Sequence, residues 1–262
     1  MDTEDLTLED LGRRGYKMYQ QKEGFRFGTD SVLLAWFAAS FVRKGKACTA
    51  LELGSGCGGA SLCLAARSDD VSIDAVEIME KPAEVLEENI KLNGLSGRMI
   101  SFNCDIRKLP SDIRSKQYDI VFMNPPFFNR GSGPAARAEG DGERLAGRFE
   151  ENGTAEDFIS VAASRVRQSS GYIIMVMHGD RLPEIMSIYE KYRIKPVRLM
   201  AVHPFEDRNA SMFLLAGKKG ASGSDMKILP PLILNRRDGK DSPVMSEELK
   251  RIYEEEHTDC FI

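Results

Sequence analysis

The sequence predicts an α/β fold with a mainly parallel, doubly wound sheet, on three observations. Seven apolar runs of strand length are distributed along the 262 residues. Patterns with helical spacing stand between most of these runs, which is typical of right-handed β-α-β crossovers. Glycine-rich or polar residues follow each of the first four runs, where parallel sheets place ligands. Together they predict a Rossmann-like, seven-stranded, mainly parallel sheet in a single domain with short terminal additions.

The predicted strands are residues 47–53, 72–77, 99–103, 118–123, 171–177, 195–202 and 211–217, and the predicted helices are residues 59–66, 81–93, 154–167 and 181–192. Thr154 is expected to N-cap the third of these helices, and Gly94 to end the second in a left-handed cap.

Two elements are expected after the sheet. An apolar run at 228–234 is interrupted by Pro230-Pro231, which confines any strand there to a sheet edge. A charged pattern at 246–256 predicts a surface helix that begins with Ser246 as its N-cap.

Composition is that of an ordinary soluble globular protein, with 42% hydrophobic residues and a formal net charge of -4. We expect a catalytic domain at 46–218, preceded by a segment and helix at 1–45 and followed by a strand and helix extension at 219–262. No run suits a membrane span or a signal peptide, so a cytoplasmic protein is expected, as a monomer or weak dimer. Five cysteines that never form C-x-x-C predict free thiols and no metal site.

The first apolar run leads into Glu52-Leu53-Gly54-Ser55-Gly56-Cys57-Gly58, where glycines allow a tight turn and close approach of backbone N–H groups to a ligand. Nucleotide, flavin and methyl-donor sites all use such a turn, and some are only tight β-α connections. Glu77 ends the second run about 20 residues later, where a carboxylate commonly binds ribose hydroxyls. Asp105 follows the third run and suits either an adenine amino group or a helix cap.

The fourth run ends in Asn124-Pro125-Pro126-Phe127, which carries most functional information. Consecutive prolines stop the strand and make an extended, stiff loop. The Asn124 amide can grip a planar amino group, and the Phe127 ring can lie on a planar base. The loop therefore favours an enzyme that modifies an exocyclic amine.

Together these elements resemble the S-adenosylmethionine-dependent amino methyltransferases, over roughly residues 25–217. The resemblance implies the class I methyltransferase fold. It also implies a donor site made of Glu52, Gly54, Ser55, Gly56, Gly58, Glu77, Ile78, Asp105, Ile106 and Asn124, and a target-amine loop made of Asn124, Pro125, Pro126 and Phe127.

The stretch from Gly24 to Trp36 is similar to the amino-terminal helix of one subgroup, the bacterial valine-tRNA adenine N6-methyltransferases. That resemblance implies adenine N6 in RNA as the acceptor, in a tRNA beside the anticodon, and places Phe27, Gly28, Thr29 and Asp30 over the donor. An amphipathic helix N-capped by Thr29 or Asp30 explains the same residues, and the two interpretations are compatible.

Contacts with RNA are expected from a cluster just after the target loop, made of Arg130, Arg137, Arg144 and Arg148. A second basic cluster consists of Lys218, Lys219, Arg236 and Arg237. The ordinary explanation for either is a solvated face, and three acids, Glu139, Asp141 and Glu143, dilute the first cluster.

Two other functions remain open. Enzymes that methylate a glutamine amide of translation release factors use the same loop, because an amide nitrogen is also planar. They usually carry an amino-terminal helical domain, for which about 45 residues before the first strand leave little room. A non-catalytic adaptor that keeps the fold is the third possibility, distinguished by a lack of donor binding.

Overall fold

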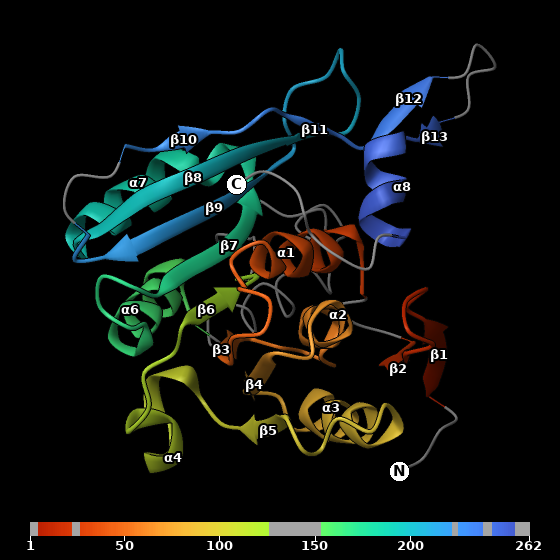
Figure 1. Ribbon diagram of the computed structural model, residues 1–262, viewed down its shortest axis with the longest axis vertical. Coiled ribbons are helices and arrows are strands. Elements are labelled where there is room, and N and C mark those ends of the chain that lie inside the picture. The colour runs from red at the N-terminus through yellow and green to blue at the C-terminus, as the bar shows by residue number, and fades with distance from the viewer. Residues whose placement is uncertain (1–4, 23–26, 126–152, 222–224, 238–242, 255–262) are drawn as a thin grey trace, which may run out of the picture.

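The computed structural model describes residues 5–22, 27–125, 153–221, 225–237 and 243–254, and its central sheet has the strand order β10-β8-β9-β7-β6-β3-β4-β5 (Figure 1). The seven main strands are β3 (Cys48–Leu53), β4 (Val71–Glu77), β5 (Met99–Asn103), β6 (Ile120–Met123), β7 (Tyr172–His178), β8 (Ile194–His203) and β9 (Met212–Lys219). Strands β3 to β7 pair in parallel, and β9 is antiparallel to both β7 and β8. The predicted mainly parallel sheet is thus confirmed, and the short strands β10 and β11 extend its seven main strands to nine.

Helices cover both faces of this sheet, which explains why its strands are apolar almost throughout. They are α1 (Thr29–Ala39), α2 (Gly59–Arg67), α3 (Glu80–Leu92), α4 (Ser111–Arg114), α6 (Ala155–Arg165), α7 (Leu182–Lys191) and α8 (Glu247–Glu254). In β6, Ile120 and Phe122 belong to the core beneath α1 and α2, whereas Val121 and Met123 belong to the core beneath α6 and α7. Successive residues face opposite sides of a strand, so this single short strand contributes to both cores.

Local signals explain where several helices begin and end. Thr154 and Asp157 form a capping box at the start of α6, and Gly94, after α3, has a φ of 65°, as both predictions require. The expected side-chain cap of α1 was wrong, because Gly28 is the N-cap and Thr29 already lies in the helix. Asp30 instead directs its carboxylate to Asn124 and to the Ser31 N–H.

A hairpin of β1 (Leu6–Asp10) and β2 (Lys17–Gln21) precedes α1, and the sequence analysis missed it. Its two strands are short and mixed in polarity, so the alternation of apolar and polar residues along them is weak. Asn89 of α3 holds the hairpin: its Oδ1 accepts the Tyr19 N–H at 2.7 Å, and its Nδ2 donates to the Tyr19 carbonyl at 2.8 Å.

The carboxyl-terminal residues add to the sheet and then fold back over α1. β10 (Lys227–Ile228) and β11 (Leu232–Ile233) pair with edge strand β8, separated by the two prolines as expected, and β12 (Asn235–Arg237) pairs with β13 (Pro243–Met245). Ser246 caps α8 by accepting the Leu249 N–H at 3.0 Å. The last turn of α8 is tied down by Arg67, whose Nη2 donates to the Ile252 carbonyl at 2.7 Å. Among the helices described, none is long and apolar enough to cross a membrane.

Candidate active site

The four chemistry-bearing loops lie side by side at the carboxyl edge of the sheet. Strands β5, β4, β3 and β6 are adjacent and parallel, so each releases its polar residues at the same edge. Leu53 at the end of β3 lies opposite Val76 of β4 on one side and Met123 of β6 on the other. The glycine-rich turn therefore stands between the loop that carries Glu77 and the loop that carries Asn124.

The turn between β3 and α2 has a backbone that requires glycine. Gly54, Gly56 and Gly58 have φ values of 72°, 54° and 92°. A Cβ on Gly58 would meet the Leu86 Cδ1 at 2.4 Å, so this position lacks room as well as a suitable backbone. The turn is fixed to β4, since the N–H groups of Gly54 and Ser55 donate to the Val76 carbonyl at 2.9 and 3.0 Å.

Glu77 is held beside that turn by backbone N–H groups. Its Oε2 accepts the Gly56 N–H at 2.8 Å, and its Oε1 accepts the Met79 N–H at 2.8 Å. The side chain is 6% exposed, and burial raises the pKa of the carboxyl although the N–H groups act in the opposite direction. Each carboxylate oxygen keeps capacity for a further donor, so a ribose hydroxyl fits the positioned acid.

Glu52 lies deeper, beneath the turn, where it joins β3 to α2. The Ser61 hydroxyl donates to its Oε2, and the residue is 3% exposed. Burial is the largest cause that raises the pKa of Glu52 to about 8, and the nearby charge of Glu77 raises it further. Its burial and its hydrogen bond thus make Glu52 a link between β3 and α2 beneath the glycine turn.

Asp105 takes the capping role that was one of its two predicted roles. Its Oδ1 accepts the Arg107 N–H at 2.8 Å, and the Arg107 guanidinium binds both carboxylate oxygens at 2.7 to 3.0 Å. That contact lowers the pKa of Asp105, so the group is an ionised acceptor. Ile106, directly after it, is buried, and Ile78 on the neighbouring loop is half-buried.

Asn124 is oriented by a residue far away in the sequence. Its Nδ2 donates to the Asp30 Oδ2 at 2.7 Å, and the Asp30 Oδ1 accepts the Ser31 N–H at 2.9 Å. An ionised carboxylate only accepts, so it must face the amide nitrogen and thereby sets the orientation of the amide. The Asn124 Oδ1 is buried and has no hydrogen-bond partner among the described residues.

The segment before α1 is placed against the glycine turn. A Cβ on Gly59 would lie 2.6 Å from the Phe27 ring, so the phenylalanine packs directly on the start of α2. The Phe27 N–H donates to Oε1 of Gln20, a buried side chain of β2, at 2.9 Å. Thr29 instead meets the last helix, with its hydroxyl 3.3 Å from the Tyr253 hydroxyl.

Comparison with known proteins supports a methyltransferase. A family model described as "Methyltransferase small domain" matches residues 27–137. The tRNA1(Val) (adenine(37)-N6)-methyltransferase of Pectobacterium carotovorum subsp. carotovorum is 30% identical over 193 residues, which are 73% of each chain. This chain belongs to the tRNA1(Val) (adenine(37)-N6)-methyltransferase family. The member from Porphyromonas gingivalis strain W83 is 27% identical over 90% of both chains.

Solved structures agree on the fold of this methyltransferase family member. A predicted O-methyltransferase from Agrobacterium tumefaciens has a TM-score of 0.65 at 19% identity, covering 87% of this chain and 97% of that one. A methyltransferase subunit of a type I restriction-modification system from Streptococcus thermophilus has a TM-score of 0.61 at 16% identity, covering 89% and 53%. These similarities support the class I methyltransferase fold.

Methyltransferases of this family use S-adenosylmethionine, and the residues at the carboxyl edge fit such a donor. The Ser55 hydroxyl in the glycine turn is buried without a hydrogen-bond partner in the described part of the chain, as is the Asn124 Oδ1. Glu77 keeps acceptor capacity for ribose hydroxyls beside the turn, where two backbone N–H groups fix its position. In the described ranges, no group of three or more His, Cys, Asp or Glu is arranged to hold a metal ion.

Several predicted site residues lie outside the described residues, namely Pro126, Phe127, Arg130, Arg137, Arg144 and Arg148. The second basic cluster does not come together in the structure. Lys218 and Lys219 lie at the end of β9, on the left of Figure 1, whereas Arg236 and Arg237 lie in β12, at the upper right. Arg236 pairs with Glu248 and Arg237 with Asp207, each at 3.2 Å.

Three supporting residues escaped the sequence analysis. Gln20 anchors Phe27, Asn89 donates to the Cys57 carbonyl of the glycine turn at 2.9 Å, and the Phe158 ring of α6 lies against Gly54. A buried amide in an otherwise apolar helical pattern is the signal that would have found Asn89.

Proposed function

We propose that this protein transfers a methyl group from S-adenosylmethionine to the N6 amino group of adenine 37 in a tRNA. The family membership supports the reaction, and the tRNA and the position are those of the relatives' activity. Within the site, one observation carries the proposal: the Asn124 amide has a buried oxygen with no hydrogen-bond partner among the described residues, at the edge where the glycine turn and Glu77 meet.

The chemical difficulty lies with the acceptor. The lone pair of an adenine amino nitrogen is delocalised into the ring, and the nitrogen must become pyramidal before it attacks. When bound, S-adenosylmethionine supplies an electrophilic methyl group on a sulfonium, so a strong general base is not required. The Asn124 Oδ1 and the Pro125 carbonyl accept the two amino hydrogens, which favours the pyramidal, partly positive nitrogen over the planar one.

Positioning carries more of the effect than hydrogen-bond strength. A neutral hydrogen bond contributes about 1 kcal/mol net, whereas alignment of reactants can contribute roughly 7 to 11 kcal/mol. Asp30 fixes which atom of the Asn124 amide faces the amine, and the proline after Asn124 limits backbone motion. Phe127 is proposed to stack on the extruded base, which contributes about 1 to 3 kcal/mol.

Glu77, the glycine turn and the Ser55 hydroxyl are proposed to hold the donor, with Asp105 at its adenine. Ile78 and Ile106 then form apolar walls beside that adenine. Phe27, Gly28 and Thr29 are proposed to cover this site from the side of α1.

The experiment that tests the function is product identification. The protein is incubated with isotopically labelled S-adenosylmethionine and one acceptor in each reaction: unmodified tRNA, total RNA or release factors. The product is analysed by mass spectrometry. We expect N6-methyladenosine at position 37 of one tRNA. Label in a glutamine side chain would establish the release-factor alternative instead. Calorimetry with S-adenosylmethionine showing no binding would leave only the adaptor.

A further inference from the structure

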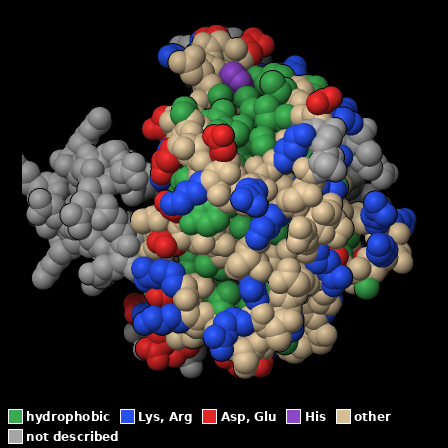
Figure 2. Space-filling view, turned by 90° about the vertical axis from the view of Figure 1, so that its left-hand side faces the viewer, with side chains coloured by type: hydrophobic (Ala, Val, Ile, Leu, Met, Phe, Trp, Pro, Cys, Tyr) green, Lys and Arg blue, Asp and Glu red, His purple; other side chains and the backbone are tan. Residues whose placement is uncertain are grey.

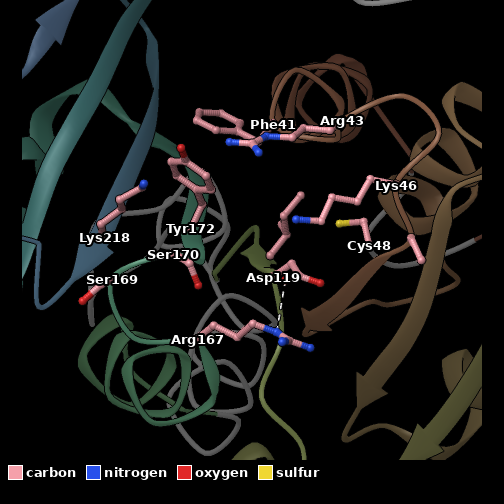
Figure 3. A pocket seen from close by; sticks show the side chains of 12 residues that line it. Phe41, Arg43, Lys46, Cys48, Asp119, Arg167, Ser169, Ser170, Tyr172 and Lys218 are labelled. Atoms are coloured by element: carbon pink, nitrogen blue, oxygen red, sulfur yellow. Dashed lines mark ion pairs between the residues drawn. The ribbon is translucent and has the colours of Figure 1, made fainter.

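A second concave site lies at the opposite, amino edge of the sheet. The cavity is about 470 Å³ and is lined by Cys48, Ile120 and Tyr172, the first residues of β3, β6 and β7 (Figure 3). Asp119, just before β6, also lines it, and Asn124 follows the same strand at its other end. Five residues of extended strand at about 3.3 Å each separate the two sites by about 17 Å.

The cavity is positively charged although the whole chain is acidic. Its lining contains four cations, Arg43, Lys46, Arg167 and Lys218, against one acid, Asp119, so the formal charge is 4 − 1 = +3, compared with -4 for the chain. Figure 3 shows Lys218 on one side and Arg43 with Lys46 on the other, with the Asp119–Arg167 pair between them. β9, which bears Lys218, ends on the left of Figure 1, the side that Figure 2 presents, where Lys and Arg side chains are spread across the surface.

The single acid is already occupied. The Asp119 Oδ2 accepts the Thr49 N–H at 2.9 Å and the Thr49 hydroxyl at 3.0 Å, and its Oδ1 accepts from the Arg167 Nε at 3.1 Å. By contrast, Arg43, Lys46 and Lys218 form no ion pair with any carboxylate of the described ranges. Three cations are thus available to a ligand.

Aromatic rings of the lining, rather than acids, contact Lys218 in the cavity and Arg198, which lies outside the lining. The Phe41 and Tyr172 ring centroids are 4.4 Å apart, with their planes inclined at 49°. The Lys218 Nζ lies 4.3 Å from the Tyr172 centroid, and the Arg198 guanidinium carbon lies 4.7 Å from the Phe41 centroid. A cation held on a ring face keeps its full charge for an anion.

The cavity has the character of a binding site and not of a second reaction centre. Cys48 is its only thiol among the lining residues, and burial raises the pKa of that thiol to about 12. The thiol therefore stays protonated and is a weak nucleophile. Exposed, unpaired cations beside aromatic rings are the groups that bind phosphates of a nucleic acid strand.

We propose that this amino-edge cavity binds backbone phosphates of the RNA substrate while the target adenine occupies the carboxyl edge. The proposal rests on the proposed function and extends it by a second contact. The straight-line separation of about 17 Å runs through the sheet and is a lower limit, so an RNA that contacts both sites passes around the helices that cover the sheet. The cavity then explains how an acidic protein gains a phosphate grip without a basic surface overall.

The test replaces two exposed cations that form no ion pair in the described part of the chain, as Arg43→Gln/Lys46→Gln. The matched control is Lys91→Gln/Lys250→Gln, which changes the net charge equally but removes lysines paired with Glu87 and Glu247 on other surfaces. Methylation of unmodified tRNA transcript is measured at several salt concentrations. We expect the KM for tRNA to rise about tenfold in the cavity variant, with kcat and the donor Kd unchanged. The slope of log KM against log salt should fall by about 1 to 2, and the control should match the wild type.

Further arms separate charge from structure and RNA from small anions. Arg43→Lys/Lys46→Arg keeps both charges and should retain the wild-type KM. A cavity variant with the wild-type KM and salt slope overturns the proposal. A second result would also overturn it. If inorganic phosphate or adenosine monophosphate stabilises the wild type but not the variant against heat, and the KM for tRNA is the same in both, the cavity is a site for small anions. Should the wild type methylate no RNA, the proposed function fails first, and equilibrium binding of tRNA to both variants still decides about the cavity.

Discussion

The two edges of the sheet differ in how they treat charge. At the carboxyl edge, the buried Glu77 carboxylate accepts backbone N–H groups, and the Asn124 amide is fixed by the Asp30 carboxylate. At the amino edge, Arg43 and Lys46 are exposed, and the half-buried Lys218 rests on the Tyr172 ring. Buried groups with fixed partners suit one small molecule in one orientation, whereas exposed cations suit a hydrated, flexible polyanion. The same strand β6 connects both, so an alteration at each edge should affect a different kinetic constant.

The largest effect is expected at the amide itself. Asn124→Ala removes the oriented acceptor for the amino hydrogens, so we expect kcat to fall about 100- to 1,000-fold, as when an enzyme loses a group that stabilises the transition state. The donor Kd should stay within a few-fold. Single-turnover rates and calorimetry measure the two quantities, and turnover like that of the wild type would remove Asn124 from the mechanism.

A smaller loss of turnover is expected from the residue that orients this amide. Asp30→Leu removes the charge-assisted hydrogen bond to the Asn124 Nδ2 and lets the amide rotate, so kcat should fall about 10- to 100-fold with little change in donor Kd. The exchange Asp30→Asn/Asn124→Asp again places one donor opposite one acceptor and should recover part of the turnover. If instead Asp30→Leu weakens donor binding and leaves kcat intact, Asp30 contacts the donor directly.

Donor affinity should respond most to Glu77. Glu77→Gln keeps the size of the side chain but replaces one acceptor of a backbone N–H by an amide donor and removes the charge. We expect the Kd for S-adenosylmethionine to rise about tenfold and kcat at saturating donor to change little. Calorimetry on both proteins provides the comparison, and equal dissociation constants would show that Glu77 takes no part in donor binding.

The smallest effect on turnover, but a clear one on stability, is expected from Glu52. Its pKa is raised from 4.5 to about 8 in the folded protein, so its contribution is fully present below about pH 4.5 and is lost as pH rises through about 8. Glu52→Gln removes this titration. The stability of the wild type relative to the variant should therefore fall between about pH 5 and pH 8, by roughly 3 to 4 kcal/mol. Urea unfolding at pH 5, 6.5 and 8 measures it, and parallel profiles would contradict a raised pKa.

Sequence reasoning found what single strands determine and missed what distant segments create. Glu77, Asp105 and Asn124 were predicted because each ends an apolar run, and parallel strands bring such ends together. The contact between Asp30 and Asn124 joins residues 94 positions apart, and no local pattern specifies it. The amino-edge cavity is likewise assembled from several segments, so its charge is invisible in a net acidic composition. The cap of α1 was wrong because Asp30 had a tertiary partner that a local rule does not include.

The docking of α8 on α1 has a consequence for the order in which the chain folds. Residues Ser31 to Ala39 of α1 are all buried, and part of their cover, including Leu249 and Ile252, belongs to the last described helix. At about 5 to 20 residues per second, a ribosome adds the residues between the two helices in roughly 10 to 40 s. Throughout that interval the apolar helix α1 of the nascent chain lacks the packing that α8 later provides. Chaperone binding to arrested nascent chains should accordingly persist until α8 has left the exit tunnel.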